Sequence, residues 1–109
     1  MEHIIYSSPK ESQIGTDIWI YQNNNGGLSI DGLYWDKSPN LEHTDGDLEL
    51  FLSVDEKDLA YLKTKVGVKS DMELIQFIIN RFSQYKHSAH TKIREWLEKE
   101  GIKYSFFTY

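Results

Sequence analysis

The pattern of apolar and polar positions predicts strands in the first half of the chain, at residues 2–6, 17–22, 28–36 and 47–54. The last segment is the clearest, because apolar and polar side chains alternate along it. Its two sets are Leu48, Leu50, Leu52 and Val54 on one side, and Asp47, Glu49, Phe51 and Ser53 on the other. We expect the first set to face the core and the carboxylates to face water. A slip of one residue would bury both acids at a cost of several kcal/mol.

Glycine and asparagine predict where the strands turn. Residues 23–27, with three asparagines and two glycines, predict a tight turn, since both residue types tolerate positive φ. Asp31-Gly32 is compatible with a β-bulge inside the strand or with a second turn that splits it, and we favour the bulge. The polar stretch 38–46 predicts a loop or hairpin connection.

Beyond Val54 the apolar period changes from two to 3.6, which predicts three helices. The first begins after Asp55 and is closed by Gly67. The second begins at a capping box of Ser70 and Glu73, and the third spans about residues 89–100. Their apolar stripes are, in order, Leu59, Leu62 and Val66; Leu74, Ile75, Ile78, Ile79 and Phe82; Ile93, Trp96 and Leu97. The aromatic and β-branched residues of 102–109 predict a final strand.

This order of elements predicts an α+β fold in a single domain over residues 1–109. The expected order is β-β-β-β-α-α-α-β. It implies a mainly antiparallel sheet of four to five strands with three helices packed on one face, and a last strand that returns to the sheet.

Charge is distributed unevenly along this frame. The formal net charge is −5. Residues 1–30 carry a net charge of −2, residues 31–58 carry −7, and residues 59–109 carry +4. Nucleic-acid binding needs clustered lysine and arginine, so the acidic centre disfavours direct contact with DNA or RNA. Glu56 and Asp58 have a local role at a helix start, where the helix dipole favours anions.

Other features exclude or disfavour several classes. The chain has no cysteine, so it has neither disulfides nor thiolate metal sites. It shows no secretory signal and no apolar run long enough to span a membrane, and we expect a soluble, cytoplasmic protein. Phosphate-binding and nucleophile-elbow motifs are absent, and the four histidines (His3, His43, His87 and His90) complete no zinc motif. We expect no enzymatic activity, no cofactor and no metal.

Carboxylate pairs do not change this expectation. Asp47 and Glu49 share a strand face about 7 Å apart, a spacing that any alternating strand produces. Nothing in the sequence buries either one to raise its pKa for acid–base work. The segment 42–47 lacks the ligand spacing of a calcium loop.

The remaining candidate is a binding surface that combines carboxylates with aromatic residues. Aromatic side chains supply contact area at low entropic cost, and carboxylates steer a basic partner. The candidate residues are Asp31, Tyr34, Trp35, Asp36, Glu42, Asp45, Asp47 and Glu49. The alternative is that the aromatic residues belong to the core and the acids only keep the protein soluble. Trp35 is in phase with Leu33, so it points either to the core or to a partner.

Residues 46–59 resemble small bacterial proteins in which an acidic strand leads directly into a helix that starts V-x-x-x-D-L. The helix at 75–82 and the segment 96–106 are similar to the same group, so the resemblance covers about residues 46–106. Some members of the group are immunity proteins of contact-dependent growth inhibition and other polymorphic toxin systems. The shared motifs are structural, and no functional residue carries over.

The resemblance implies an immunity protein that binds and neutralises a cognate toxin. A nuclease is the expected toxin, because its basic active site binds phosphates and an acidic, aromatic surface would complement it. The alternative is a small regulatory or adaptor domain that binds a protein unrelated to toxins. Neither function requires a cofactor, direct contact with nucleic acid, or a membrane.

Overall fold

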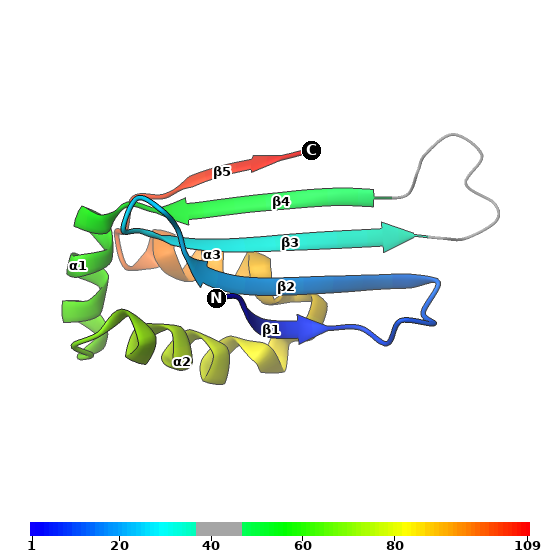
Figure 1. Cartoon of the computed structure of the whole chain (residues 1–109), viewed down its shortest axis with the longest axis horizontal. Helices are drawn as coiled ribbons and strands as arrows, with labels where there is room; N and C mark the ends of the chain where they lie inside the picture. The colour runs from blue at the N-terminus through cyan, green and yellow to red at the C-terminus, as the bar shows by residue number, and fades with distance from the viewer. Residues whose placement is uncertain (37–46) are drawn as a thin grey trace.

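The computed structural model describes residues 1–36 and 47–109 (Figure 1). The strands are β1 (His3–Ser7), β2 (Ile14–Gln22), β3 (Leu28–Asp36), β4 (Asp47–Val54) and β5 (Ser105–Thr108). The helices are α1 (Glu56–Val66), α2 (Asp71–Phe82) and α3 (Ala89–Lys99), with a 3-10 helix, η1 (Ser83–Ser88), between the last two. The predicted α+β class is confirmed.

The five strands form one antiparallel sheet in the order β1-β2-β3-β4-β5. β2 and β3 form a hairpin at the predicted turn, where Gly26 adopts a φ of 79°. The Asn23 side chain holds this turn, since its Oδ1 accepts hydrogen bonds from the backbone N–H of Asn25 and of Gly27, both over 3.0 Å. The three helices are inserted between β4 and β5, so the last strand returns to the edge of the sheet.

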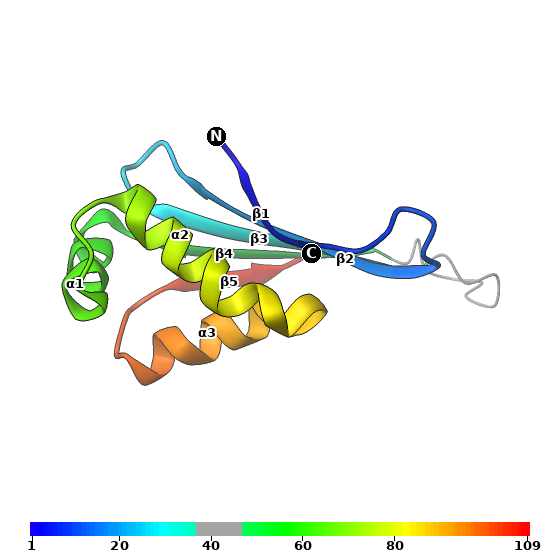
Figure 2. The same cartoon turned by 90° about the horizontal axis from the view of Figure 1, so that it is seen from below.

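The expectation that three helices pack on one face is wrong, because only two of them do so. α2 and α3 cover one face of the sheet, whereas α1 lies at the end of the strands (Figures 1 and 2). A single residue, Asp55, separates β4 from α1, so the helix begins at the sheet's end before the chain can cross the face. Gly67, at a φ of 88°, ends α1 as predicted.

The core lies between the sheet and the two covering helices. The strands contribute Ile18, Ile20, Leu28, Ile30 and Leu52, and the helices contribute Leu74, Ile75, Ile78, Ile93 and Leu97. Each of these side chains is almost fully buried and contributes roughly 1.5–3 kcal/mol to stability. Trp96 is buried with them, as predicted. None of the helices in the described ranges is long and apolar enough to cross a bilayer.

The predicted bulge at Asp31-Gly32 is wrong. β3 pairs with β2 and with β4 in unbroken register through both residues. Gly32 lies beside His90, which packs against the strand from α3, and a Cβ on residue 32 would lie 3.4 Å from His90 Cδ2. The irregular register occurs instead in β1, between Ile4 and Tyr6.

The prediction for β4 is correct except at its first apolar residue. Leu50, Leu52 and Val54 are buried, and Asp47 and Glu49 are exposed. Leu48 is 43% exposed, because the starts of β2 and β4 and the end of β3 extend beyond the helix layer (Figure 2). The alternation of β4 identified the correct face, but it carried no information on where the helices end.

Candidate partner-binding face

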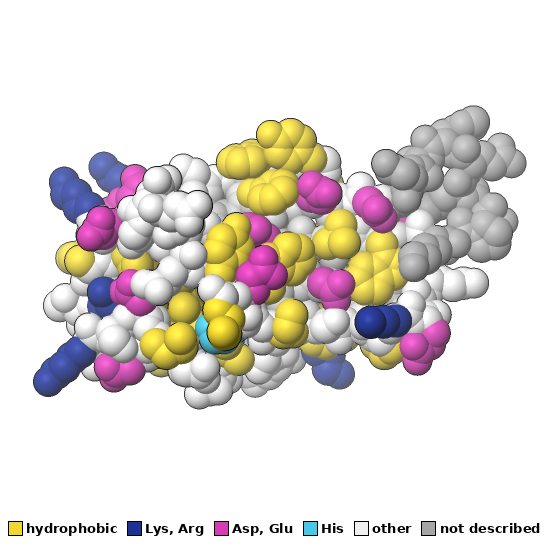
Figure 3. Space-filling model, viewed as in Figure 1, with side chains coloured by type: hydrophobic (Ala, Val, Ile, Leu, Met, Phe, Trp, Pro, Cys, Tyr) yellow, Lys and Arg dark blue, Asp and Glu magenta, His cyan; other side chains and the backbone are white. Residues whose placement is uncertain are grey.

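Because side chains alternate along strands, one face of the sheet carries the helices and the other carries none of them. We call this helix-free side the open face, and Figure 3 shows it with apolar and acidic side chains interspersed. By strand register it comprises Ile4, Ser7, Asp17, Trp19, Tyr21, Ser29, Asp31, Leu33, Trp35, Asp47, Glu49, Phe51, Ser53, Ser105, Phe107 and Tyr109.

A row of cross-strand neighbours runs through the centre of the open face. Asp31 on β3 lies between Trp19 on β2 and Phe51 on β4, and Phe51 pairs with Phe107 on β5. The Phe51 and Phe107 rings stack at 5.4 Å between centroids. Tyr109 meets both of them edge-on at 5.6 Å. The row therefore places one carboxylate among aromatic side chains.

The position of Asp31 corrects the prediction, because we expected this acid to be exposed and to steer a basic partner. Its residue is only 7% exposed, and its Oδ2 accepts a hydrogen bond of 2.9 Å from the Tyr21 hydroxyl. Burial raises the pKa of the Asp31 carboxyl above its ordinary value; the Tyr21 hydrogen bond acts in the opposite direction, and the nearby Glu2 carboxylate raises it further. Burial and the Asp31 carboxylate likewise raise the pKa of Tyr21.

Three further acids surround this centre and remain in contact with water. Asp47 and Glu49 are exposed on β4, and Asp17 is half-buried on β2, where it accepts a 2.5 Å hydrogen bond from the Ser7 hydroxyl. Among residues 1–36 and 47–109, no lysine or arginine forms a salt bridge with these three acids. Their charges are therefore not neutralised by ion pairs within the part of the chain that is described.

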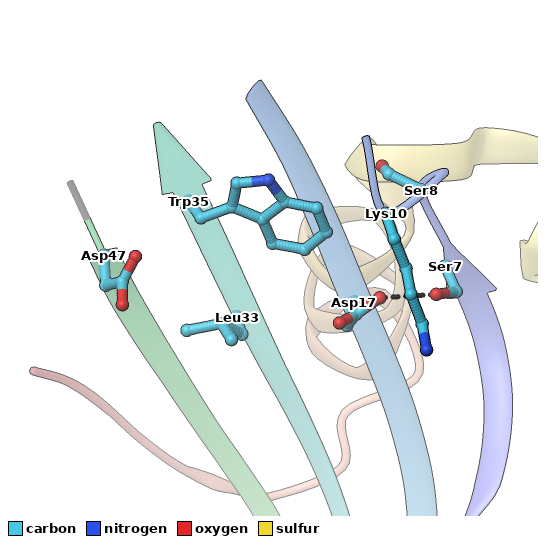
Figure 4. A pocket seen from close by; sticks show the side chains of 7 residues that line it. All are labelled: Ser7, Ser8, Lys10, Asp17, Leu33, Trp35 and Asp47. Atoms are coloured by element: carbon cyan, nitrogen blue, oxygen red, sulfur yellow. Dashed lines mark hydrogen bonds between the residues drawn. The ribbon is translucent and has the colours of Figure 1, made fainter. Parts of the chain in front are cut away.

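Trp35 lies on the open face and does not enter the core. Its indole covers Gly15, where an added Cβ would lie 2.1 Å from a ring carbon, and its Nε1–H donates to the carbonyl of Ser12 over 3.2 Å. The ring borders a hollow of about 400 Å³ (Figure 4), which we call the Trp35 hollow. Lys10, Asp17 and Asp47 are among its other lining residues.

The Asp31 hollow is a second concavity on the same face, with a volume of about 280 Å³. Its lining includes Tyr21, Ser29, Asp31, Phe51 and Phe107. A third concavity of about 260 Å³ is lined by Trp19, Leu33, Glu49 and Phe51 among others. The open face is thus hollowed in several places along its aromatic residues.

The eight predicted residues do not all meet on this surface. Asp31, Trp35, Asp47 and Glu49 do lie on the open face. Tyr34 and Asp36 do not lie on the open face, because their positions in β3 place them on the helix side. The Tyr34 hydroxyl donates to the carbonyl of His87 over 2.8 Å, and burial raises its pKa. Glu42 and Asp45 lie outside the described residues.

The predicted set omitted several residues of the open face, among them Asp17, Trp19, Tyr21, Phe51 and Phe107. Alternation within 17–22 was the available signal, since it separates Ile18 and Ile20 from Trp19 and Tyr21. The predicted set was chosen near the acidic stretch of the sequence, so it missed these residues. Finding them requires the pairing register between strands that are distant in the sequence.

His90, one of the four histidines that complete no zinc motif, belongs to the interior. It is buried beneath the sheet, and its Nε2–H donates to the carbonyl of Ile30 over 2.9 Å. Burial lowers the pKa of its imidazole; the hydrogen bond to Ile30 acts in the opposite direction, and the Arg94 charge lowers it further. His87 is exposed, and His43 lies outside the described residues. Within the described ranges, no three histidine, aspartate or glutamate side chains group as metal ligands.

Comparison with known proteins gives no relative for this chain. No protein-family model, no curated protein and no solved structure matches it.

Proposed function

We propose that this chain is an immunity protein that binds a basic toxin through the open face of its sheet and does no chemistry itself. The observation that carries the proposal is the composition of the open face. It gathers aromatic side chains and four carboxylates on the side of the sheet that the helices leave uncovered (Figure 3).

The charge on this face favours a basic partner. Asp17, Asp47 and Glu49 form no salt bridges with described lysines or arginines, and Lys10 borders the Trp35 hollow together with Asp17 and Asp47. A focused negative field accelerates association with a positive surface, to about 10⁸–10⁹ M⁻¹s⁻¹ in the fastest cases. Rapid capture is the property that a cell needs against a lethal enzyme.

The aromatic residues supply the contact area that charge alone does not. Phe107 is 51% exposed and Tyr109 is 75% exposed, beside the half-buried Trp19, Trp35 and Phe51. Clusters of large exposed apolar side chains are uncommon on isolated domains and mark binding surfaces. Tryptophan and tyrosine are also the residues that most often dominate interface energies.

A nuclease toxin is the partner that this chemistry fits best. Its active site binds phosphates with lysine and arginine, and carboxylates spaced along strands present an alternative set of anions to the same groups. The resemblance of residues 46–106 to immunity proteins supports the same conclusion. The protein would then act in the cytoplasm, where the nuclease meets its substrate.

Co-expression tests the proposal. The chain serves as bait in a lysate of its source cells, and the gene of each captured basic protein is then induced in a host cell. We expect one such protein to stop growth when expressed alone and to be tolerated when this chain is present. Captured proteins that are harmless alone would contradict an immunity function and would favour a regulatory or adaptor domain.

A further inference from the structure

The Asp31 hollow combines three features that do not usually occur together on an exposed sheet. It contains the carboxylate of Asp31, a residue that is only 7% exposed, aromatic rings on its walls, and empty space beside them of about 280 Å³. Pockets for whole small-molecule ligands measure about 300–1,000 Å³, so this hollow suits a single side chain.

From this geometry we propose that the Asp31 hollow is a receptor for one arginine side chain of the protein partner. The inference rests on the proposed function and adds the chemical identity of its central contact. The guanidinium would pair with Asp31 and lie against the ring of Phe51, which faces Asp31 directly from β4.

The hydrogen bonds of Asp31 leave room for such a ligand. Tyr21 donates to Oδ2, whereas no described side chain donates to Oδ1. A guanidinium carries five N–H donors in a planar fork, so it can bind the free oxygen without displacing the Tyr21 hydroxyl. A neutral ligand would leave the carboxylate in an apolar setting without a counter-charge.

The walls favour arginine over lysine. The Phe51 and Phe107 rings are stacked at 28° between their planes, and Tyr109 supports both edge-on, so the rings form a preorganised wall. A planar guanidinium stacks on an aromatic face and is weakly hydrated, whereas an ammonium group loses strong hydration on entering such a site.

The same chemistry argues against the other occupants of an aromatic sheet face. A second copy of this chain would bring Asp47 and Glu49 against their equivalents without a compensating cation on the described part of the open face, other than Lys10 at its border. A phosphate-bearing ligand would meet the same repulsion.

Titration with short blocked peptides, followed by NMR, tests the receptor without the natural partner. The probes are acetyl-Gly-Xaa-Gly-amides in which Xaa is arginine, lysine or citrulline, together with free arginine. We expect the arginine peptide to bind with a Kd in the millimolar range and to shift the signals of Asp31, Tyr21 and Phe51. The lysine peptide should bind several-fold more weakly, and the neutral citrulline peptide should not bind measurably.

Variants locate the binding. Asp31→Asn should raise the Kd of the arginine peptide at least about tenfold, and Phe51→Leu should raise this Kd several-fold by removing the stacking surface. Glu95→Gln on α3 is the matched control, because it also replaces a carboxylate by an amide but lies off the open face, and it should leave Kd within about twofold. The NMR spectra of the variants report directly whether they are folded.

Three results would overturn the inference: no shift with the arginine peptide, equal binding by Asp31→Asn, or binding of free arginine but not of the peptide. The last result would indicate a small-molecule site. None of these results bears on capture of a basic protein by the whole face, so the receptor can fail while the proposed function stands. Conversely, saturable arginine binding at the Asp31 hollow without any captured toxin would refute the immunity function but would support the arginine receptor.

Discussion

The Tyr21 hydroxyl donates a hydrogen bond to Asp31 Oδ2 across the β2–β3 pair, over 2.9 Å. This contact keeps a carboxylate ordered among aromatic side chains at the centre of the open face. A buried carboxylate without a cation lowers the stability of a fold, because its charged form loses hydration. Under the proposed function, Asp31 is a binding residue whose burial lowers the stability of the fold.

Replacing Asp31 by asparagine should stabilise the protein at pH 7. The pKa of Asp31 is raised in the folded state, so the native protein takes up a proton at a higher pH than the unfolded chain does. The buried charge thus costs stability above the folded pKa, and this cost fades as the pH falls toward about 4. Urea unfolding of both proteins from pH 7 to pH 4 should show a difference in unfolding free energy that shrinks with acidification. A variant less stable than wild type at pH 7 would contradict this account.

Replacing Tyr21 by phenylalanine tests the other half of the contact. It removes the donor and leaves the buried carboxylate in place, so we expect a destabilisation of about 1–3 kcal/mol at pH 7. In the Asp31→Asn background the same replacement should cost less, since no charge is stranded. Equal costs in the two backgrounds would show that Tyr21 and Asp31 are energetically independent.

His90 should make stability fall as the pH drops below neutrality. Its pKa is lowered in the folded state from an ordinary value of about 6.5, so the unfolded chain takes up the proton first. His90→Gln should flatten the dependence of unfolding free energy on pH between pH 7 and pH 5. The exposed His87→Gln is the matched control and should change this slope less. A wild-type slope in His90→Gln would contradict the buried position of the imidazole.

Leu52 and Leu48 test the boundary of the helix layer, because they point to the same side of β4. Leu52 is 1% exposed and Leu48 is 43% exposed. Leu52→Ala should cost about 2–5 kcal/mol, and Leu48→Ala should cost less than about 1 kcal/mol. Similar costs, measured by urea unfolding, would mean that the core extends further along the sheet than the structure shows.

The packing of Trp35 on Gly15 can also be tested by mutation. A methyl group on residue 15 would overlap the indole, so Gly15→Ala should displace the ring and cost about 1–3 kcal/mol. The indole N–H signal of Trp35 should shift as its hydrogen bond to Ser12 is lost. In a Trp35→Leu background the cost should largely disappear, and an unchanged cost would place the indole elsewhere.

Local signals in the sequence were sufficient for the elements of the fold. Ser70 caps α2 as predicted, with its hydroxyl accepting from the Glu73 N–H over 3.1 Å and donating to the Glu73 carboxylate over 3.2 Å. The turn at 23–27, the third helix from Ala89 and the face of β4 were also predictable. Each depends on residues within a few positions of one another, which is the range that periodicity and capping report.

The candidate site was less predictable because it depends on contacts between distant strands. Asp31 was expected in water, yet its partners Tyr21 and Phe51 lie ten and twenty residues away along the chain. Tyr34 and Trp35 are neighbours in sequence but lie on opposite faces, so nearness in sequence to the acidic stretch grouped them wrongly. The alternation of side chains along a strand is enough to place Tyr34 on the face opposite to Trp35. The burial of Asp31, in contrast, follows only from the assembled sheet.

The central claim is that the open face binds a basic protein. Reversing the charge of acidic residues on this face tests the claim most directly. Asp47→Lys/Glu49→Lys changes the open face, and Glu95→Lys/Glu98→Lys makes an equal change of charge on α3. Both variants and the wild type serve as bait in a lysate of the source cells, at low and high salt. We predict a basic protein that wild type and the α3 variant retain at low salt, that the open-face variant loses, and that high salt releases. Equal retention by both variants, or loss from the α3 variant alone, would contradict the account.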